Sequence, residues 1–335
     1  MVSKPEADAP LGVKDLVFSD LYLGHPGLED RFSEFPRGPV KPVPQDPVLR
    51  GDINALLEIC TATLEKTPSL HDFRICHDGV GYRVSVVPCM AGKVFVLRKI
   101  AGTMAASLSE LGIPLAYVRQ MMAKDLSGLF LVSGAVKAGK TTTACTMLKD
   151  RLLAYGGVAV TGEDPIELPL EGCYGEGLCF QTLASRQGGG FADAFWRLMS
   201  FGANLILIDE VRDAETAVEM LQASGNGQIM ISTIRAESVS QAVTRLYSMA
   251  SEKMSPANAR FLVADGLAGV LHQHMMPPLG SMAKLSTEGL FLKDAPAIRT
   301  VLRNGDYDHL SSHIRQQVST MISDIAGSVR RFSTV

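Results

Sequence analysis

The sequence predicts an α/β protein in which a parallel-sheet, phosphate-loop domain follows a smaller α+β domain. The first observation is an apolar, strand-like run at 128–133 that leads directly into a phosphate-loop consensus. The second is that strand-like and helix-like segments alternate from residue 128 onward, which is typical of a parallel sheet. The third is the length of 335 residues, which exceeds what one ordinary hydrophobic core organises.

Residues 1–100 are expected to form the smaller domain. Its predicted elements are a short strand, a helix and a two-stranded hairpin, at 15–23, 52–66, and 81–87 with 93–98. The helix is expected to begin at Asp52, which is a suitable N-cap residue. The segment 36–47 contains five prolines and is therefore predicted to be an extended connector.

Residues 101–126 are expected to link the domains and to contain a helix at 116–122. The second domain, 127–335, has predicted strands at 129–133, 158–161, 205–209 and 228–233. Its predicted helices lie at 140–154, 191–200, 214–223 and 239–250. The remaining chain is expected to be mostly helical, at 256–270, 295–304 and 309–325.

The motif that opens the second domain fits G-x-x-x-x-G-K-[ST]. Its residues are Gly134, Ala135, Val136, Lys137, Ala138, Gly139, Lys140 and Thr141. A strand before the loop and a helix after it aim backbone N–H groups and the positive helix end at phosphates. Lys140 is expected to reach the β- and γ-phosphates of a nucleotide, the Thr141 hydroxyl to bind Mg²⁺, and Thr142 to extend the contact. The alternative is a chance match in a glycine-rich turn.

Acidic residues follow two other predicted strands. Four apolar residues lead into Asp209 and Glu210, and Glu163 and Asp164 follow the strand at 158–161. Because the carboxyl ends of parallel strands share one edge of a sheet, these acids are expected beside the phosphate loop. One carboxylate can hold Mg²⁺, and another can orient or deprotonate a water molecule. The alternatives are a solvated strand end for the first pair and a local turn for the second.

Composition excludes several classes of protein. The hydrophobic fraction of 46% and the charged fraction of 20% are those of a soluble globular protein. A net charge of −3 gives no electrostatic footprint for direct nucleic-acid binding. No apolar run approaches the roughly 20 residues of a transmembrane segment, and the N-terminus lacks the pattern of a signal peptide. The six cysteines include no C-x-x-C pair, so reduced thiols in a cytoplasmic protein are expected.

Several segments, in order along nearly the whole chain, resemble the type II/type IV secretion ATPase superfamily (GspE/PilT-like). The first domain contributes S-D-L-Y-L at 19–23, Y-R-V-S at 82–85 and V-L-R-K-I at 96–100. The second contributes E-D-P-I-E at 163–167, E-V-R-D-A-E-T at 210–216 and P-A-I-R-T-V-L-R-N-G at 296–305. The joint match is specific, because E-D-P-I-E and R-D-x-E-T are not general features of phosphate-loop proteins.

The resemblance implies a RecA-like ATPase domain preceded by a PAS-like domain, assembled as a homohexameric ring. ATP and Mg²⁺ are the implied cofactors, and the implied partner is an inner-membrane platform protein of a pilus or secretion machine. The implied location is cytoplasmic, peripheral to the inner membrane. The implied activity is ATP hydrolysis that drives type IV pilus dynamics, type IV secretion or conjugative transfer.

The resemblance also implies roles for individual residues. Glu163 would polarise the attacking water, and Glu210 would serve the Mg²⁺ and water shell with Asp209 assisting. Arg83 and Arg98 fall where family members supply arginines from the N-terminal domain, and their fork of donors suits the charge on the γ-phosphate. For each arginine the alternative is a salt bridge at a strand end.

Three residues depart from the family pattern. Gln228 and Arg235 stand where the family segment T-G-H…G-T-L-H-T has histidines. Arg235 cannot titrate, but it is expected to sense the γ-phosphate. Lys137 occupies a position that is often glycine, where it would strain a turn of positive φ or add a cation for nucleotide binding. The tetracysteine zinc motif of assembly motors is absent, which favours a retraction-like or conjugation-type relative.

Two other functions fit parts of the pattern. The missing histidines and Lys137 fit a nucleotide-binding regulatory subunit with little turnover. The phosphate loop alone fits a small-molecule kinase, but the sequence offers no candidate for an arginine-rich lid. His272 and His274 have the spacing that places two imidazoles on one face of a strand, yet no third metal ligand stands nearby in the sequence.

Overall fold

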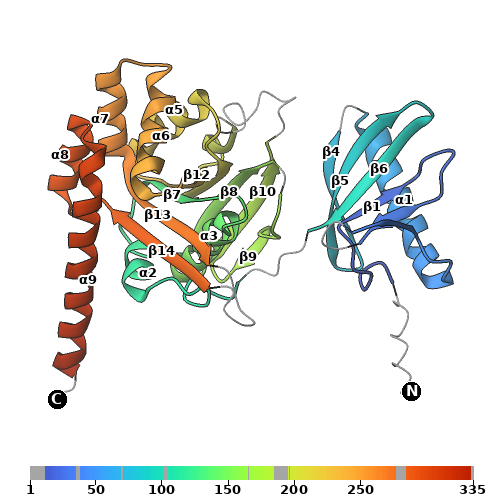
Figure 1. Ribbon diagram of the computed structural model, residues 1–335, viewed down its shortest axis with the longest axis horizontal. Helices are drawn as coiled ribbons and strands as arrows, with labels where there is room; N and C mark the ends of the chain where they lie inside the picture. Colours follow the sequence, from blue (N-terminus) through green and yellow to red (C-terminus); the bar gives the residue numbers. More distant parts are fainter. Residues whose placement is uncertain are drawn as a thin grey trace. The chain divides into compact units, whose positions relative to one another are not determined.

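The computed structural model describes residues 12–34, 38–68, 71–100, 105–164, 166–184, 195, 197–276 and 284–332, with side chains described up to residue 321. The chain forms two compact units. The first consists of Met1–Gly102 with Pro165–Pro169, and the second of Thr103–Asp164 with Leu170–Val335. Figure 1 labels most of the helices and strands of both units. Among the described residues, no helix combines the length and the apolar character that crossing a membrane requires.

The first unit is built on a six-stranded antiparallel sheet in the order β3-β2-β1-β6-β5-β4. Its strands are β1 (Asp20–Leu23), β2 (Arg31–Ser33), β3 (Val40–Pro42), β4 (Asp72–His77), β5 (Val80–Cys89) and β6 (Gly92–Lys99). Side chains alternate between the two faces of each strand. One face is therefore apolar and buried, through residues such as Leu21, Tyr82 and Leu97.

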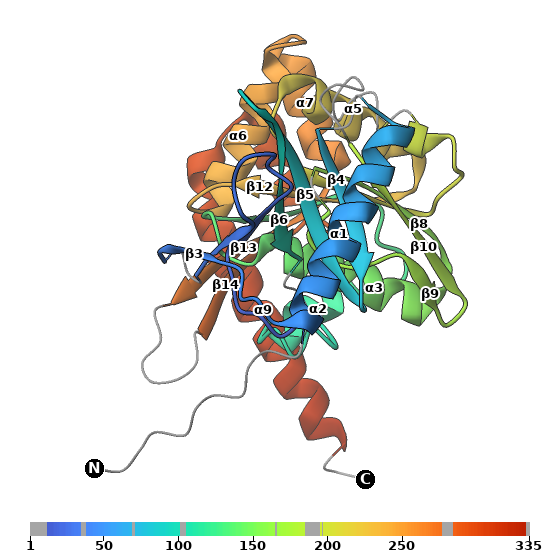
Figure 2. The same cartoon turned by 90° about the vertical axis from the view of Figure 1, so that its right-hand side faces the viewer.

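The helix α1 (Pro47–Lys66) packs on this apolar face and contacts β4 (Figure 2). Its buried residues recur at helical spacing: Leu49, Ile53, Leu56, Cys60 and Leu64. The predicted start of the helix was wrong, because Asp46 is the N-cap and accepts hydrogen bonds from the N–H groups of Val48 and Leu49. Asp52 lies inside the helix instead, and its carboxylate accepts a hydrogen bond from the N–H of Val13.

The predicted hairpin is confirmed, with β5 and β6 paired up to Cys89 and Gly92. Two other expectations for this unit were incomplete. The proline-rich segment is more than a connector, because Val40–Pro42 pairs with β2 at the edge of the sheet, where a proline is tolerated. The strand β4 was not predicted, although Phe73 and Ile75 alternate with polar residues as a half-buried strand requires.

The second unit is built on an eight-stranded sheet in the order β14-β13-β7-β12-β11-β8-β10-β9. Its strands are β7 (Gly128–Gly134), β8 (Gly157–Glu163), β9 (Gly172–Tyr174), β10 (Gly177–Leu183), β11 (Leu205–Glu210), β12 (Ile229–Arg235), β13 (Leu267–Met276) and β14 (Lys284–Phe291). All neighbours from β13 to β10 are parallel, which confirms the predicted parallel sheet. The edge strands β14 and β9 are antiparallel and were not predicted.

Helices flank this sheet (Figure 1). They are α2 (Leu115–Met121), α3 (Lys140–Tyr155), α5 (Ala214–Ala223), α6 (Val239–Ser251), α7 (Pro256–Gly266), α8 (Pro296–Asn304) and α9 (Leu310–Phe332). The helix predicted at 256–270 was wrong in its last part, because the apolar residues from Leu267 onward form β13 beside β7. Half of the helix predicted at 191–200 lies outside the described residues, and Phe195 and 197–199 within it are helical. Helices on the sheet explain why every residue of β7 and β11 is buried.

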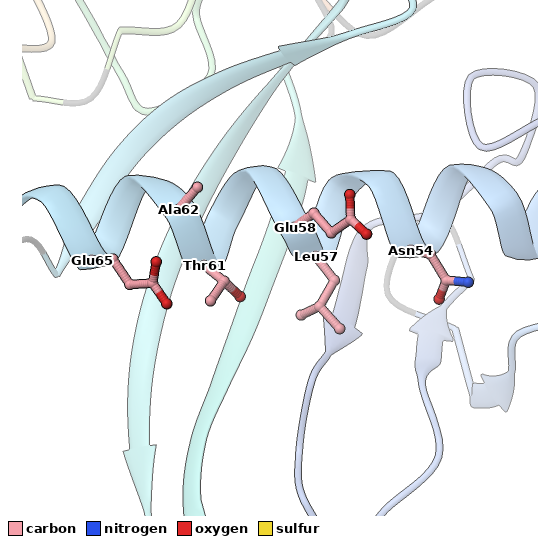
Figure 3. A pocket seen from close by; sticks show the side chains of 6 residues that line it. All are labelled: Asn54, Leu57, Glu58, Thr61, Ala62 and Glu65. Carbon is pink, nitrogen blue, oxygen red and sulfur yellow. The ribbon is translucent and has the colours of Figure 1, made fainter.

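A pocket of about 450 Å³ runs along α1 in the first unit (Figure 3). The side chains that line it are Asn54, Leu57, Glu58, Thr61, Ala62 and Glu65. None of them belongs to a motif of the sequence, and no residue of the phosphate loop lines this pocket. The candidate nucleotide site is therefore built elsewhere, in the second unit.

Candidate functional site

Four parallel strands end side by side at one edge of the second sheet. β7 ends at Gly134, β12 at Arg235, β11 at Glu210 and β8 at Glu163. In the ladder, Arg235 is the partner of Gly134, and Glu210 is the partner of Thr233 on β12. The strand order β7-β12-β11-β8 thus brings the start of the phosphate loop and the acidic residues to the same edge.

Two glycines shape the phosphate loop. Gly134 has a φ of 155°, and a Cβ added there would lie 2.4 Å from the backbone oxygen of Gln273. Gly139 is the N-cap of α3 with a φ of 82° in the left-handed region, and no described side chain caps the helix. The N–H groups in the first turn of a helix have no partner within the helix. This helix start therefore offers backbone donors and the positive end of the helix dipole to an anion.

The two lysines of the loop are placed differently. Lys137 is exposed and has a φ of 66°, so the position does require the left-handed conformation that lysine adopts at a cost of roughly 1–2 kcal/mol. Lys140 is the first residue of α3, and its Nζ donates a hydrogen bond of 2.9 Å to the carbonyl of Ala135. Its ammonium therefore lies across the loop. Thr141 and Thr142 follow in the first turn of α3, half-buried.

Gln273 on β13 contacts the loop and was missed in the sequence. It is 1% exposed, and its Nε2 donates a hydrogen bond of 2.5 Å to the carbonyl of Ala138. The adjacent His272 contacts the Ser133 hydroxyl through Nδ1 at 3.1 Å, and burial lowers the pKa of this histidine. The histidine pair of β13 gains no further ligands, since the described residues contain no group of three His, Cys, Asp or Glu that could hold a metal.

Glu163 is buried and hydrogen-bonded. It is 1% exposed, and its Oε1 accepts hydrogen bonds from the Thr161 hydroxyl at 2.6 Å and from Gln181 Nε2 at 2.9 Å. Thr161 lies on the same face of β8, and Gln181 is its ladder partner on β10. Such donors stabilise a carboxylate that is withdrawn from water. Neither donor was predicted, because the pairing of β10 with β8 is a property of the fold.

Asp209 and Glu210 are each 7% exposed at the end of β11. The Arg212 guanidinium contacts both, with Nε 2.8 Å from Glu210 Oε2 and Nη2 3.3 Å from Asp209 Oδ2. Two adjacent buried carboxylates repel each other unless a cation lies close by. Arg212 therefore offsets the repulsion between the two acidic side chains, although it was not predicted as a site residue.

The two positions that lack the family histidines lie at opposite ends of β12. Arg235 ends the strand, and its Nε lies 2.8 Å from Glu210 Oε1, so Glu210 is held between Arg235 and Arg212. Gln228 precedes the strand, and its Nε2 donates to the carbonyl of Ala203 at 2.9 Å. The seven residues of β12 separate the two positions by roughly 20 Å. Only Arg235 lies at the acidic edge.

Arg83 and Arg98 belong to the first unit, where they are ladder partners on β5 and β6. Arg83 Nη2 lies 3.4 Å from Asp72, and Arg98 Nη2 lies 2.6 Å from Asp20. Asp20 and Asp72 are each the first residue of a strand. In this structure both arginines therefore form the strand-end salt bridges that were the alternative to a nucleotide contact. Such exposed pairs contribute only about 0–1 kcal/mol, and both guanidinium groups can exchange partners at little cost.

Comparison with known proteins bears on most of the chain. Residues 67–326 match the family described as Type II/IV secretion system protein. A putative type II secretion system protein E of Escherichia coli K12 is 32% identical over 206 residues, which cover 61% of this chain and 39% of that protein. The chain spans less than half the length of the curated relatives it matches.

Two solved structures have a similar fold. The pilus retraction motor PilT, solved with bound ADP, has a TM-score of 0.72 and 23% identity, covering 90% of this chain and 86% of its own. The ATPase DotB of Legionella pneumophila has a TM-score of 0.68 and 19% identity, covering 94% of this chain and 88% of its own. At these identities the likeness concerns the fold alone, and it confirms the predicted RecA-like architecture.

Proposed function

Because this chain belongs to the type II/IV secretion system protein family, we propose that it is an ATP-hydrolysing motor subunit of a type IV pilus, type IV secretion or conjugative transfer machine. The observation that carries the proposal is the convergence of the phosphate loop, Glu163 and the Asp209–Glu210 pair at one sheet edge. A nucleotide-binding site needs these three parts together: a phosphate cradle, oxygen ligands for a metal and a carboxylate for water.

The loop fits a nucleotide triphosphate. The uncapped start of α3 and the left-handed Gly139 supply backbone donors for phosphate oxygens. Lys140 Nζ, which lies on the Ala135 carbonyl, would exchange this neutral acceptor for the β- and γ-phosphates and gain a charge-assisted hydrogen bond. Lys137 adds a second cation to the exposed side of the loop. These residues would bind and orient the phosphates.

The donor set also fits Mg²⁺, a hard cation that prefers oxygen ligands. The Thr141 hydroxyl and the Glu210 carboxylate would hold it, and Asp209 would support its water shell. When bound, the ion neutralises charge on the phosphates. Glu210 would have to exchange an arginine for the metal, and Arg235 is the partner that can leave, since its side chain is 53% exposed whereas that of Arg212 is 30% exposed.

Glu163 would polarise the attacking water, because it is a buried carboxylate at the same edge as the loop. Arg83 and Arg98 would exchange their aspartates for the γ-phosphate during the cycle, as the family resemblance implies. We further propose a homohexamer that works in the cytoplasm at the inner membrane, with a platform protein of the machine as its partner. γ-Phosphate contact and release would then change the angle between the two units.

The test is steady-state ATP hydrolysis by the full chain with two variants. Lys140→Ala is expected to weaken nucleotide binding, and Glu163→Gln is expected to bind ATP normally but to reduce the turnover number at least about 100-fold. Binding of a fluorescent ATP analogue separates the two effects. Full turnover by either variant would contradict the assigned roles.

A second candidate function is a nucleotide-binding regulatory subunit with little turnover. Two observations favour it. Lys137 has a left-handed backbone conformation that strains the loop, and Arg235 forms an ion pair with Glu210, the carboxylate that would have to bind the metal. This candidate predicts that the wild-type chain binds the ATP analogue without appreciable phosphate release, even when membranes are present. Sustained turnover by the wild type would exclude it.

A further inference from the structure

Gln181 connects the carboxylate of Glu163 to the chain segment that follows it. Its Nε2 donates to Glu163 Oε1 at 2.9 Å. Its Oε1 accepts two backbone hydrogen bonds, from the N–H of Leu170 at 2.7 Å and from the N–H of Glu171 at 2.9 Å. One side chain on β10 therefore bridges the end of β8 and the return of the loop after it.

The orientation of this amide is fixed by its partners. Backbone N–H groups can only donate, so the atom that faces Leu170 and Glu171 must be the carbonyl oxygen. The other end of the amide, facing Glu163, is then the NH₂ group. A flipped amide would place its NH₂ against two donors and its oxygen against a carboxylate, and would lose three hydrogen bonds.

We propose that Gln181 is a positioning residue that holds the Glu163 carboxylate in the rotation required for hydrolysis. This inference rests on the proposed function of Glu163. Two donors on one oxygen, the Thr161 hydroxyl and the Gln181 amide, determine the plane of the carboxylate. The hydrogen bonds from the N–H groups of Leu170 and Glu171 in turn determine where the Gln181 amide lies. The position of this loop therefore determines the orientation of the Glu163 carboxylate.

The thiol of Cys179, near Gln181 and Glu163, does not add an ionisation of its own to the pH–rate profile. Cys179 is the nearest buried titratable group on β10, and burial together with the charges of Glu163 and Glu171 raises its pKa to about 12. Its thiol therefore stays protonated throughout an assay between pH 6 and about 9. Any new ionisation caused by a change at Gln181 then belongs to the carboxyl groups of Glu163, Glu171 and the substituted residue and not to Cys179.

The test uses two variants of Gln181 in the full chain. Gln181→Met keeps the length of the side chain but removes the donor and the acceptor. It is expected to lower the turnover number roughly 10- to 100-fold with little change in the KM for ATP, because misaimed catalytic groups affect the chemical step. Gln181→Glu keeps the acceptor for the loop and sets a carboxylate against Glu163. Two close carboxylates share one proton, so the pH–rate profile should gain an ionisation that the wild type lacks.

A matched control is Gln317→Glu. Gln317 bridges in the same manner, since its Oε1 accepts from the N–H of Phe291 at 3.1 Å and its Nε2 donates to the carbonyl of Phe291 at 2.5 Å. It lies on α9, which carries no residue of the candidate site. This variant should lower the melting temperature and leave the pH–rate profile unchanged, which is how a purely structural glutamine behaves.

The possible results separate this inference from the proposed function. An inactive wild type, or full turnover by Glu163→Gln, would contradict the function itself. Suppose that the wild type is active and Glu163→Gln is not. If both Gln181 variants then have the same turnover number and pH–rate profile as the wild type, only the positioning role is overturned. A lower turnover number in Gln181→Met together with a new ionisation in Gln181→Glu supports it, and melting curves confirm that both variants are folded.

Discussion

The close approach of the phosphate loop to β13 makes Gly134 the most sensitive position of the loop. Its φ of 155° lies in a region that side-chain-bearing residues rarely adopt, and a Cβ there would meet the backbone oxygen of Gln273 at 2.4 Å. Ordinary contacts of a Cβ begin near 3.4 Å. A Gly134→Ala substitution therefore creates an overlap of about 1 Å with a backbone atom that the sheet holds in place.

The structure offers a control that isolates this overlap. Gly172 has a similar φ of 145°, but nothing lies within 4 Å of a Cβ added there. Gly172→Ala should cost only the backbone strain, on the order of 1–3 kcal/mol. Gly134→Ala should cost this strain plus about 1–3 kcal/mol for the overlap. The loop must also move away from β13 in this variant, so the affinity for ATP should fall at least about tenfold.

Urea denaturation of both variants measures the free energy of unfolding, and titration with a fluorescent ATP analogue measures the affinity. We expect Gly134→Ala to be the less stable of the two variants and to be the one that loses affinity for the analogue. Equal losses of stability, with nucleotide binding intact in both, would show that the loop does not depend on its contact with Gln273.

Three further changes test other parts of the site. Arg235→Gln should lower the Mg²⁺ concentration needed for half-maximal hydrolysis up to about fivefold, since one of two cations on Glu210 is removed and solvent screening of the 53% exposed arginine limits its contribution to about 1 kcal/mol; an increased demand for Mg²⁺ would argue against competition at Glu210. Lys137→Gly should raise the free energy of unfolding by up to about 1 kcal/mol, because relief of the left-handed strain outweighs the added chain entropy; urea denaturation would show a clear loss if the lysine were stabilising the loop. Burial lowers the pKa of His272, so the unfolded chain binds its proton more readily and stability is lost as the pH falls below about 6.5. His272→Asn should remove this loss between pH 7.5 and 5.5; identical pH dependence of unfolding in wild type and variant would refute this.

Four strands of the second sheet, β7, β8, β11 and β12, could be predicted because they have strong local signals, whereas the parallel strand β10 was not predicted. The segment that forms β7 is an apolar run that leads into the phosphate loop, and the segment that forms β11 is an apolar run that ends in two acidic residues. The edge strands β9 and β14 have weaker patterns, since β9 is three residues long and β14 contains lysine, serine, threonine and glutamate. The change from α7 into β13 was missed because a continuous apolar segment has no period that distinguishes a helix from a buried strand.

The candidate site was predicted only as far as its motifs extend. Lys140, Glu163 and Glu210 belong to local patterns, and the parallel order of their strands brings them to one edge. Gln181 and Gln273 belong to no motif, because their roles come from pairing between strands distant in sequence. Both Gln228 and Arg235 depart from the family pattern, and the length of β12 shows that they lie at opposite ends of the strand, with only Arg235 at the acidic edge.

The most direct test is a structure of the full chain with Mg²⁺ and a non-hydrolysable ATP analogue. We predict that the triphosphate lies at the start of α3 and that Lys140 Nζ leaves the Ala135 carbonyl for the γ-phosphate. We also predict a water between this phosphate and Glu163 that donates a hydrogen bond to the carboxylate. An analogue bound away from the loop, or a γ-phosphate with Glu163 turned away from it, would contradict the account.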